Sequence, residues 1–365
     1  MTRIVILPGD GIGPEVAGEA ALCLALLSTR SGLDFTFESH DFGGVAIDNH
    51  GTPLPEATLA ACRGADATLL GAVGGPQWDG AAERPEAGLL KLRAALGLFA
   101  NLRPARVIAG LEHLSPLKAE TAADADILVV RELTGGAYFG EKCLSDDFGS
   151  DVWAYTREEV ERIAHVAFDA ARRRSKRLTS VDKANVLASS KLWRRVVSEV
   201  GRDYPDVALD HLYVDAAAMA LVTHPRAFDV IVTENMFGDI LSDELAVIPG
   251  SIGLLASAST GAAKVGLFEP VHGSAPDIAG LDVANPAGAI ASAAMLLDHV
   301  GFSDAARALA AALEDTIADG CRTADLGGDA RCSEFGAAVR ERIAIRSGQM
   351  EAIQDLVAMN RGCCG

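Results

Sequence analysis

The chain has 365 residues, of which 49% are hydrophobic and 22% charged, and its formal net charge is −18 at pH 7. This composition is typical of folded globular proteins and excludes wholesale disorder, and the length suffices for two domains or one large one. A nucleic-acid partner is disfavoured because such proteins present a basic face. We expect no membrane partner either, since no targeting segment and no long apolar run is seen.

The seven cysteines contain no C-x-x-C pair. An odd number without metal-ligand spacing is typical of free thiols in a reducing compartment, so we expect a cytoplasmic protein. Cys363 and Cys364 are neighbours at the end of the chain, and we interpret them as thiols rather than as a metal site.

The stretch VILPGDGIGPEV, residues 5–16, predicts a short strand, a glycine turn and a helix. Gly9 and Gly11 match the first two glycines of the dinucleotide-binding pattern G-x-G-x-x-G, but Pro14 stands at the place of the third. Proline suits the first turn of a helix and does not allow the close helix–strand approach that a glycine allows. A pyrophosphate loop and a tight turn that binds nothing both remain open on this stretch alone.

Short apolar strands alternate with amphipathic helical patterns along the rest of the chain, which predicts an α/β layered fold with a partly parallel sheet. One helix is predicted over 156–174, where Thr156 and Glu159 form a capping box. The basic run RRRSKR at 172–177 fits the solvated end of this helix better than a nucleic-acid patch. The candidate strands are 4–7, 68–71, 126–130, 180–182 and 230–233.

Three arginines lie in contexts that suggest an anion pocket. Arg93 lies on a predicted helix, Arg103 precedes a proline, and Arg131 ends a very apolar strand. Each alone is more often a surface or ion-paired side chain. Together they could grip two carboxylates, because a guanidinium binds a carboxylate through two parallel hydrogen bonds.

The segment VTENMFGDILSDEL places Asp239 and Asp243 four residues apart, which puts both carboxylates on one face of a helix. A solvated helix face is the simpler interpretation, but hard oxygen ligands at this spacing also suit Mg²⁺ or Mn²⁺. Asp215 is a third acid, between a strand and an apolar stretch.

Two further side chains could transfer protons. Lys183 ends a strand in an apolar context, where a lysine pKa shifts readily, and Tyr138 follows a flexible Gly-Gly pair. Each alone is more often structural.

A glycine- and proline-rich stretch, 268–280 with 284–290, precedes another predicted helix and could wrap an adenine and its ribose. Asp277 there would accept a hydrogen bond from a ribose 2′-hydroxyl and repel a 2′-phosphate, which favours NAD over NADP.

At these residues the chain resembles the isocitrate/isopropylmalate dehydrogenases, a family of decarboxylating β-hydroxyacid dehydrogenases, from about residue 3 to about residue 345. Seven segments carry the resemblance in order: LPGDGIGPEV, LLGAVGGPQWD, LFANLRPA, VVRELTGGAYFGE, SVDKANVL, TENMFGDILSDE and FEPVHGSAPDIAG.

The resemblance implies a two-domain α/β layered fold that is not a Rossmann fold. It implies a cofactor-binding domain built from both chain ends, residues 1–98 and 251–365. The middle, residues 99–250, would carry the substrate and metal sites and pair two subunits into a homodimer with shared active sites.

The resemblance also assigns roles. Arg93, Arg103 and Arg131 would bind the substrate carboxylates, and Tyr138 and Lys183 would be catalytic. Asp215, Asp239 and Asp243 would hold Mg²⁺ or Mn²⁺, with Asp215 and Lys183 supplied by the partner subunit and Asp215 also facing the substrate. NAD⁺ would be held by Gly74, Gly75, Pro76 and Glu86 and by His272, Gly273, Ser274, Ala275, Pro276, Asp277, Ile278, Ala279, Gly280 and Asn285. Whether K⁺ assists stays open.

Substrate choice depends on Glu86, Leu89, Leu90 and Val186. Glu86 would repel the third carboxylate of isocitrate, and the three apolar side chains offer a surface for an isopropyl group. The implied reaction is the NAD⁺-dependent oxidation and decarboxylation of 3-isopropylmalate. Tartrate/D-malate and homoisocitrate enzymes of the family are the nearest alternatives, and an inactive regulatory relative or an RNA-binding module are more distant ones.

Three segments depart from the family pattern, and one of them, SDELAVIPG, carries a proline after Asp243 that does not touch the ligands. EKCLSDDFGSDVW, in the region of the arm that braces the dimer, is less basic than expected. The tail after about residue 346 extends past the usual end of the family and could be a last helix or an extension.

Overall fold

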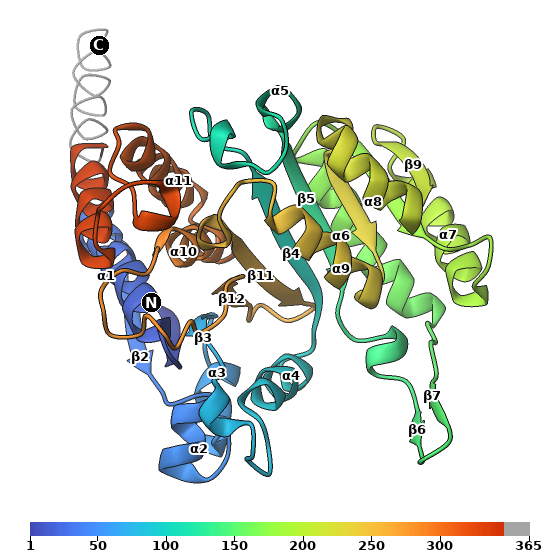
Figure 1. Ribbon diagram of the computed structural model, residues 1–365, viewed down its shortest axis with the longest axis horizontal. Coiled ribbons are helices and arrows are strands. Elements are labelled where there is room, and N and C mark those ends of the chain that lie inside the picture. The colour runs from blue at the N-terminus through green and yellow to red at the C-terminus, as the bar shows by residue number, and fades with distance from the viewer. Residues whose placement is uncertain (347–365) are drawn as a thin grey trace, which may run out of the picture. The chain divides into compact units, whose positions relative to one another are not determined.

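The structure is a computed structural model that describes residues 1–346 (Figure 1), so the tail and Cys363 and Cys364 lie outside the described residues. The chain forms two compact units. Unit 1 combines Met1–Leu92 with the chain from Lys264 onward, and unit 2 is Arg93–Ala263. The expected boundaries, after residues 98 and 250, and the cofactor and substrate roles of the two parts stay predictions.

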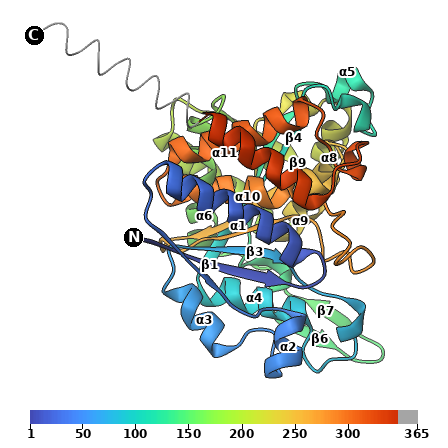
Figure 2. The ribbon, with the colours of Figure 1, turned by 90° about the vertical axis from the view of Figure 1, so that its left-hand side faces the viewer.

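Unit 1 contains a mainly parallel sheet in the order β2-β1-β3-β12. Helix α10 packs on β12 and β3 and lies between α1 and α11, as Figure 2 shows. The predicted strands at 4–7 and 68–71 are confirmed within β1 and β3. The elements are β1 (Thr2–Gly9), β2 (Phe35–Ser39), β3 (Ala67–Ala72), β12 (Leu267–Pro270), α1 (Gly13–Arg30), α2 (Gly44–His50), α3 (Glu56–Arg63), most of α4 (Pro85–Ala95), α10 (Ala287–His299), α11 (Ser303–Ala318) and helical residues 332–346.

The start of α1 lies very close to β3. A Cβ on Gly13 would overlap the carbonyl oxygen of Pro8 and lie 2.7 Å from the amide nitrogen of Ala72. A Cβ on Gly71 would overlap the carbonyl oxygen of Gly13. The close helix–strand approach that Pro14 cannot supply is therefore present, but Gly13 provides it one position earlier.

Unit 2 contains the sheet β11-β4-β5-β10-β8-β9, in which β4 pairs antiparallel with β5 and β11 and the other pairs are parallel. The predicted strands at 126–130, 180–182 and 230–233 are confirmed within β5, β8 and β10. The elements are β4 (Leu98–Arg106), β5 (Asp126–Glu132), β8 (Arg177–Asp182), β9 (Ala208–Tyr213), β10 (Val230–Thr233), β11 (Ala256–Gly261), α5 (Ala119–Ala122), α6 (Arg157–Arg172), α7 (Ala188–Val200), α8 (Val214–Thr223) and α9 (Asn235–Ala246).

Helices α6 and α7 bury one face of this sheet. Leu128, Val130, Val230 and Val232 pack against them in one hydrophobic core, and Trp193 of α7 is among the largest buried side chains. Because strand side chains alternate between faces, Val129 and Arg131 point to the opposite face. Helix α9 packs there against β5, β10 and β4.

The predicted helix at 156–174 is confirmed as α6, with its capping box intact: the Thr156 amide donates to Glu159 (2.7 Å), and the Glu159 amide donates to the Thr156 hydroxyl (3.3 Å). Its apolar residues Val160, Ile163 and Ala167 are buried as the pattern predicts.

The departing segment after Tyr138 forms a two-stranded hairpin of β6 (Lys142–Leu144) and β7 (Gly149–Asp151). All residues of both strands are exposed, and Leu144 and Phe148 are 89% and 60% exposed.

Among the described residues, Cys23, Cys62 and Cys332 are buried free thiols, whereas Cys143 is exposed on the hairpin. No helix in residues 1–346 is long and apolar enough to cross a membrane.

We expect Gly13→Ala to lower the free energy of unfolding by about 1–3 kcal/mol, because its methyl group overlaps two backbone atoms that cannot move aside. Gly18 of the same helix has open space where a Cβ would lie, with nothing within 4 Å, so Gly18→Ala is the matched control. The control should be neutral or stabilising by about 0.5–1 kcal/mol. Urea unfolding followed by circular dichroism measures both, and equal midpoints would contradict the close packing.

Candidate functional site

The predicted arginine Arg131 ends β5 on the face that α9 covers. Its side chain is 7% exposed, and burial lowers its pKa. The guanidinium forms an ion pair with Asp239 and donates to the amide oxygen of Asn235 from Nε (3.1 Å) and Nη2 (2.8 Å). A Cβ on Gly238 would be 2.6 Å from the Arg131 side chain, so this glycine lets the helix approach the arginine.

Arg103 lies on the neighbouring strand β4, with its side chain 17% exposed. Its Nε donates to the amide oxygen of Asn101 (2.9 Å), and its Nη1 donates to the Ser242 hydroxyl (2.8 Å) and to Asp243 (3.0 Å). The positive charges of Arg103 and Arg93 both act on Arg131. The structure therefore brings the three predicted arginines together in unit 2.

Helix α9 carries both predicted acids, as the four-residue spacing indicates. Its start is fixed by Glu234, whose carboxylate accepts from the Phe237 amide (2.6 Å) and the Met236 amide (3.2 Å). Asp239 and Asp243 are one turn apart and are 34% and 69% exposed, so both remain accessible although each contacts an arginine.

The loop that carries Tyr138 is built on a buried carboxylate. Glu132 is fully buried and accepts from the amides of Thr134 (2.9 Å) and Gly135 (2.8 Å). Tyr138 is 41% exposed and donates to Asp239 (2.7 Å). Partial burial and this hydrogen bond raise the pKa of Tyr138 to about 12, so the phenol keeps its proton at neutral pH.

Lys183 and Asp215 form an ion pair with each other. Lys183 follows β8 and Asp215 opens α8, and the hydrogen bond from Lys183 lowers the pKa of Asp215. Within the described chain, the predicted residues of unit 2 thus fall into two groups, one around Arg131 and one formed by this pair. Val186 lies beside the pair in sequence and is 66% exposed.

Four of the predicted residues, Arg93 among them, lie on α4. Glu86 is in its first turn and exposed, Leu90 is 51% exposed, and Leu89 is half-buried. Arg93 lies near the end of the same helix, where unit 2 begins.

The glycine turn of residues 9–13 contacts the predicted adenine loop. The Ile12 amide donates to the carbonyl oxygen of Ser274 (2.8 Å). A Cβ on Gly11 would overlap that same oxygen, and Gly11 has a φ of +57°. The turn therefore supports the loop through backbone contacts, in which the amides of Asp10, Ile12 and Gly13 are all hydrogen-bonded to backbone carbonyl oxygens.

Glu15, in the first turn of α1, braces the far end of the same loop. Its carboxylate accepts from the amides of Gly280 (2.5 Å) and Asp282 (3.0 Å). The loop contains two non-glycine residues with positive φ, Ala275 (+38°) and Asp282 (+59°). Such backbone conformations persist where contacts with the surroundings stabilise them. Here the hydrogen bonds of Glu15 and of the Ile12 amide provide that stabilisation.

His272 begins the loop, and one nitrogen of its imidazole ring has an unused hydrogen-bonding capacity. Its Nδ1 lies 2.9 Å from the Gly273 carbonyl oxygen, while Nε2 is buried without a hydrogen-bond partner. Burial lowers the His272 pKa, so the imidazole is neutral at pH 7. A buried polar atom of this kind requires a partner, which a ligand could provide. At the other end of the loop, Asn285 caps α10 through the Ala287 amide (2.9 Å) and donates to Asp325 (2.9 Å).

The predicted loop of Gly74, Gly75 and Pro76 is held by Asp10. This buried carboxylate accepts from the amides of Gly74 (2.8 Å), Gly44 (2.8 Å) and Val45 (2.9 Å). A Cβ on Gly74 would be 2.5 Å from a Glu86 carboxylate oxygen, so Gly74 and Glu86 lie close together. Within unit 1, the predicted residues thus form two loops joined to the strand-to-helix turn.

The three aspartates predicted as metal ligands are not assembled in one chain. Among residues 1–346, one group of three His, Cys, Asp or Glu side chains has ligand atoms within 4.8 Å of one another, namely Glu15, Asp282 and Cys332. Hydrogen bonds to backbone amides already occupy Glu15 and Asp282, and burial raises the pKa of the Cys332 thiol to about 12. This group is therefore structural.

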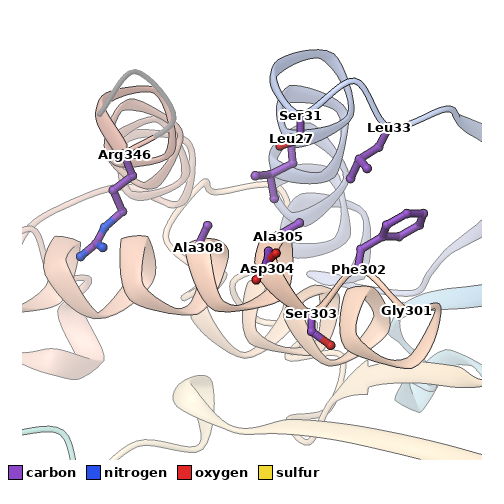
Figure 3. A pocket seen from close by; sticks show the side chains of 10 residues that line it. All are labelled: Leu27, Ser31, Leu33, Gly301, Phe302, Ser303, Asp304, Ala305, Ala308 and Arg346. Carbon is purple, nitrogen blue, oxygen red and sulfur yellow. The ribbon is translucent and has the colours of Figure 1, made fainter. Parts of the chain in front are cut away.

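Two hollows lie away from these residues. One, of about 380 Å³, lies beside the C-terminal end of α1 and the start of α11 (Figure 3), and one of about 460 Å³ lies at the basic run 172–177. In the second, Arg174 pairs with Asp126 and Asp229, which accounts for its charge. The first is lined by Leu27, Ser31, Leu33, Gly301, Phe302, Ser303, Asp304, Ala305, Ala308 and Arg346.

Four residues that contact or support the site escaped prediction: Asn101, Asn235, Glu15 and Asp10. Asn101 is two residues before Arg103 on the same strand, so the two side chains lie on one face of the sheet. The alternation of strand residues would therefore have predicted this contact. Asn235 and Glu15 act through contacts with residues that are distant in sequence, which no local pattern reveals.

The chain is similar to known proteins over nearly its whole length. The isocitrate/isopropylmalate dehydrogenase family model matches residues 3–339. The chain is 56% identical over 343 residues to a 3-isopropylmalate dehydrogenase of Staphylococcus saprophyticus, covering 93% of this chain and 99% of that protein. It is 57% identical over 348 residues to a 3-isopropylmalate dehydrogenase of Salinibacter ruber, covering 93% and 95%.

Solved structures give the same result. An isocitrate dehydrogenase from Methylococcus capsulatus superposes with a TM-score of 0.83 at 37% identity, covering 94% of this chain and 99% of that one. A β-decarboxylating dehydrogenase from Thermococcus kodakarensis gives 0.80 at 37% identity, covering 99% and 98%. The chain belongs to the isocitrate/isopropylmalate dehydrogenase family, and its two-unit α/β fold is the fold of that family and not a Rossmann fold.

Glu234 gives a testable pH dependence. Burial raises the pKa of Glu234 from 4.5 to about 6. Its stabilising contribution is then complete below pH 4.5 and is lost as the pH rises through about 6, because the folded chain binds the proton more tightly.

Glu234→Gln removes this titration. The unfolding free energy of the wild type relative to the variant should fall by about 2 kcal/mol between about pH 4 and pH 7. Urea unfolding of both proteins across this range measures the difference. A difference that does not vary with pH would contradict the shifted carboxyl.

Proposed function

We propose that the chain is an NAD⁺-dependent 3-isopropylmalate dehydrogenase of leucine biosynthesis. It oxidises and decarboxylates (2R,3S)-3-isopropylmalate to 4-methyl-2-oxopentanoate. The observation that carries the proposal is the cluster of arginines in unit 2, held beside two accessible aspartates and a protonated tyrosine. Several relatives of that name, 52–57% identical over most of the chain, support it.

The two carboxylates of the substrate are bound by Arg93, Arg103 and Arg131. The buried guanidinium of Arg131 acts in a low dielectric, where its attraction for an anion is strong. Arg103 and Arg131 keep fixed orientations through their Nε hydrogen bonds, so their terminal nitrogens are pre-oriented.

Asp239 and Asp243, with Asp215 of a second subunit, are the residues that would hold Mg²⁺ or Mn²⁺. Three carboxylates are the hard oxygen donors that these cations prefer, and all three are at least one-third exposed. A divalent cation bound there lowers the pKa of the substrate hydroxyl and stabilises negative charge on the product oxygen.

The loop from His272 to Asn285 would hold the adenine half of NAD⁺, and the Gly74–Pro76 loop with Glu86 would lie near its nicotinamide. The buried Nε2 of His272 is the open hydrogen-bonding group in this loop. Exposed Asp277 favours a free ribose 2′-hydroxyl and therefore NAD⁺ over NADP⁺.

The protein's own groups then supply the proton transfers. Lys183 would assist removal of the proton from the substrate hydroxyl, and bound NAD⁺ would supply the hydride acceptor. Loss of CO₂ would break the carbon–carbon bond to the departing carboxylate, the electron pair of that bond would be accepted by the new carbonyl as an enolate, and Tyr138 would deliver a proton to the carbon. The phenol of Tyr138 is protonated at neutral pH and can donate that proton.

The active form is a homodimer in which Lys183 and Asp215 enter the site of the partner. Their pairing with each other, apart from the Arg131 group, supports this arrangement because both would move together into a second subunit's site. The exposed apolar residues of the β6–β7 hairpin fit a dimer arm. We place the enzyme in the cytoplasm and leave K⁺ as a possible further activator.

Glu86, Leu89, Leu90 and Val186 select the isopropyl group. Glu86 repels a third carboxylate. The side chains of Leu90 and Val186 are exposed and available to contact the isopropyl group. A few methylene contacts discriminate by only about 1–3 kcal/mol. Tartrate/D-malate or homoisocitrate dehydrogenase activity is therefore the alternative function.

NADH formation by the purified chain tests the proposal directly. With Mg²⁺, we expect 3-isopropylmalate to be preferred over isocitrate, homoisocitrate, D-malate and tartrate, and EDTA to abolish the activity. Preference for another acid would overturn the proposed pocket while leaving the reaction type intact. Absence of turnover on every acid would favour an inactive relative.

Glu15→Ala tests the brace of the adenine loop. Loss of its two charge-assisted hydrogen bonds should raise the KM for NAD⁺ about tenfold, with little change in the KM for 3-isopropylmalate. Glu158→Ala is the matched control, because Glu158 also lies in the first turn of a helix but in unit 2. A KM for NAD⁺ equal in both variants would contradict a role for Glu15.

A further inference from the structure

The arginines of the described chain differ in what accepts their Nε hydrogen. In five ion pairs of the described residues a carboxylate accepts it, as Asp182 does from Arg194 (2.8 Å). The Nε groups of Arg3, Arg172, Arg174 and Arg346 likewise donate to Glu38, Asp206, Asp229 and Asp315. Arg103 and Arg131 donate instead to the neutral amide oxygens of Asn101 and Asn235.

Both asparagine side chains are buried and fixed in orientation. Asn101 and Asn235 are 0% and 1% exposed. A guanidinium only donates hydrogen bonds, so each amide must turn its oxygen toward the arginine and its NH₂ group away. The NH₂ group of Asn101 donates to the hydroxyls of Ser257 (2.8 Å) and Ser259 (3.1 Å).

Asn235 is fixed in the same way. Its NH₂ group donates to the carbonyl oxygen of Gly135 (3.2 Å), and its backbone amide donates to the Tyr155 hydroxyl (3.0 Å). Asn101 also lies opposite Arg131 in the register of β4 and β5, and Arg131 is the residue that donates to Asn235. The two asparagines are therefore close to the same arginine.

We propose that Asn101 and Asn235 are positioning residues for the reaction, which fix the Arg103 and Arg131 guanidinium groups through neutral acceptors. They thereby add no negative charge to that of Asp243 and Asp239, which already pair with these arginines. This inference rests on the proposed function. A carboxylate in either place would hold the guanidinium equally well but would cancel the charge that the substrate must meet.

The substitution Asn101→Asp isolates charge from shape. The two side chains have nearly the same size, and the acceptor toward Arg103 is kept. The second oxygen would face the hydroxyls of Ser257 and Ser259, which can rotate to donate to it. The variant should therefore fold, with a negative charge added beside Arg103.

Asn235→Asp is the second variant, at the other arginine. Asn49→Asp is the control, because it adds the same charge at an exposed asparagine of α2. Initial rates with varied 3-isopropylmalate and varied NAD⁺ give separate KM values, and thermal unfolding reports folding.

We expect Asn101→Asp and Asn235→Asp to raise the KM for 3-isopropylmalate about tenfold or more, while the KM for NAD⁺ changes less than about twofold. The control should match the wild type. A folded Asn101→Asp enzyme with an unchanged KM for 3-isopropylmalate overturns the inference. Equal rises in both KM values with a lowered unfolding temperature also overturn it, because they indicate a purely structural role.

The same experiment separates the two proposals. Turnover by the wild type together with unchanged KM values in the variants overturns the inference alone. A wild type without turnover of 3-isopropylmalate overturns the proposed function and, with it, the inference.

Discussion

The buried positive charge of Arg131 is the constraint around which unit 2 is arranged. A guanidinium at the end of β5 cannot stay buried without acceptors, and it cannot bind an anion if those acceptors cancel its charge. The chain satisfies the burial of Arg131 with an amide oxygen against Nε and Nη2, which adds no negative charge, and with an accessible aspartate against Nη1, which neutralises the guanidinium only in part. Helix α9 must therefore begin where Asn235 reaches the arginine, and Glu234 fixes that beginning by accepting two backbone amides.

In unit 1, backbone contacts fix the positions of the loops. The glycine turn approaches the 272–285 loop so closely that Ile12 donates directly to Ser274, and carboxylates hold the ends of neighbouring segments. Asp10 joins the start of α2 to the Gly74 loop, and Glu15 joins α1 to Gly280. A turn that resembles a pyrophosphate-binding loop therefore acts as a support for other loops.

Much of this could be predicted from local patterns. The strand ending in Arg131, the helix carrying Asp239 and Asp243, and the capping box at Thr156 follow from periodicity and spacing over a few residues. The Asn235 contact could not be predicted in this way, because it joins residues 104 apart in sequence. Gly13 shows a smaller limit: the pattern located a glycine-dependent close approach, but the backbone placed it one residue before the position that the motif specifies.

An acidic chain that binds a dianion needs a physical explanation, which the arrangement of charges supplies. At physiological salt, surface acids act over about 8 Å, so most of the −18 charge is screened from the site. Arg131 and Arg103 act at short range from a poorly solvated position, where screening is weak. Asp239 and Asp243 contact these arginines, so the two aspartates and the two arginines partly neutralise each other before anything binds. An anion and a cation that bind together would pair with the arginines and the aspartates, respectively. Either ion alone would have to compete with the ion pairs between these arginines and aspartates. In the proposed site, this interleaving of opposite charges would make binding of the acid and of the cation mutually dependent.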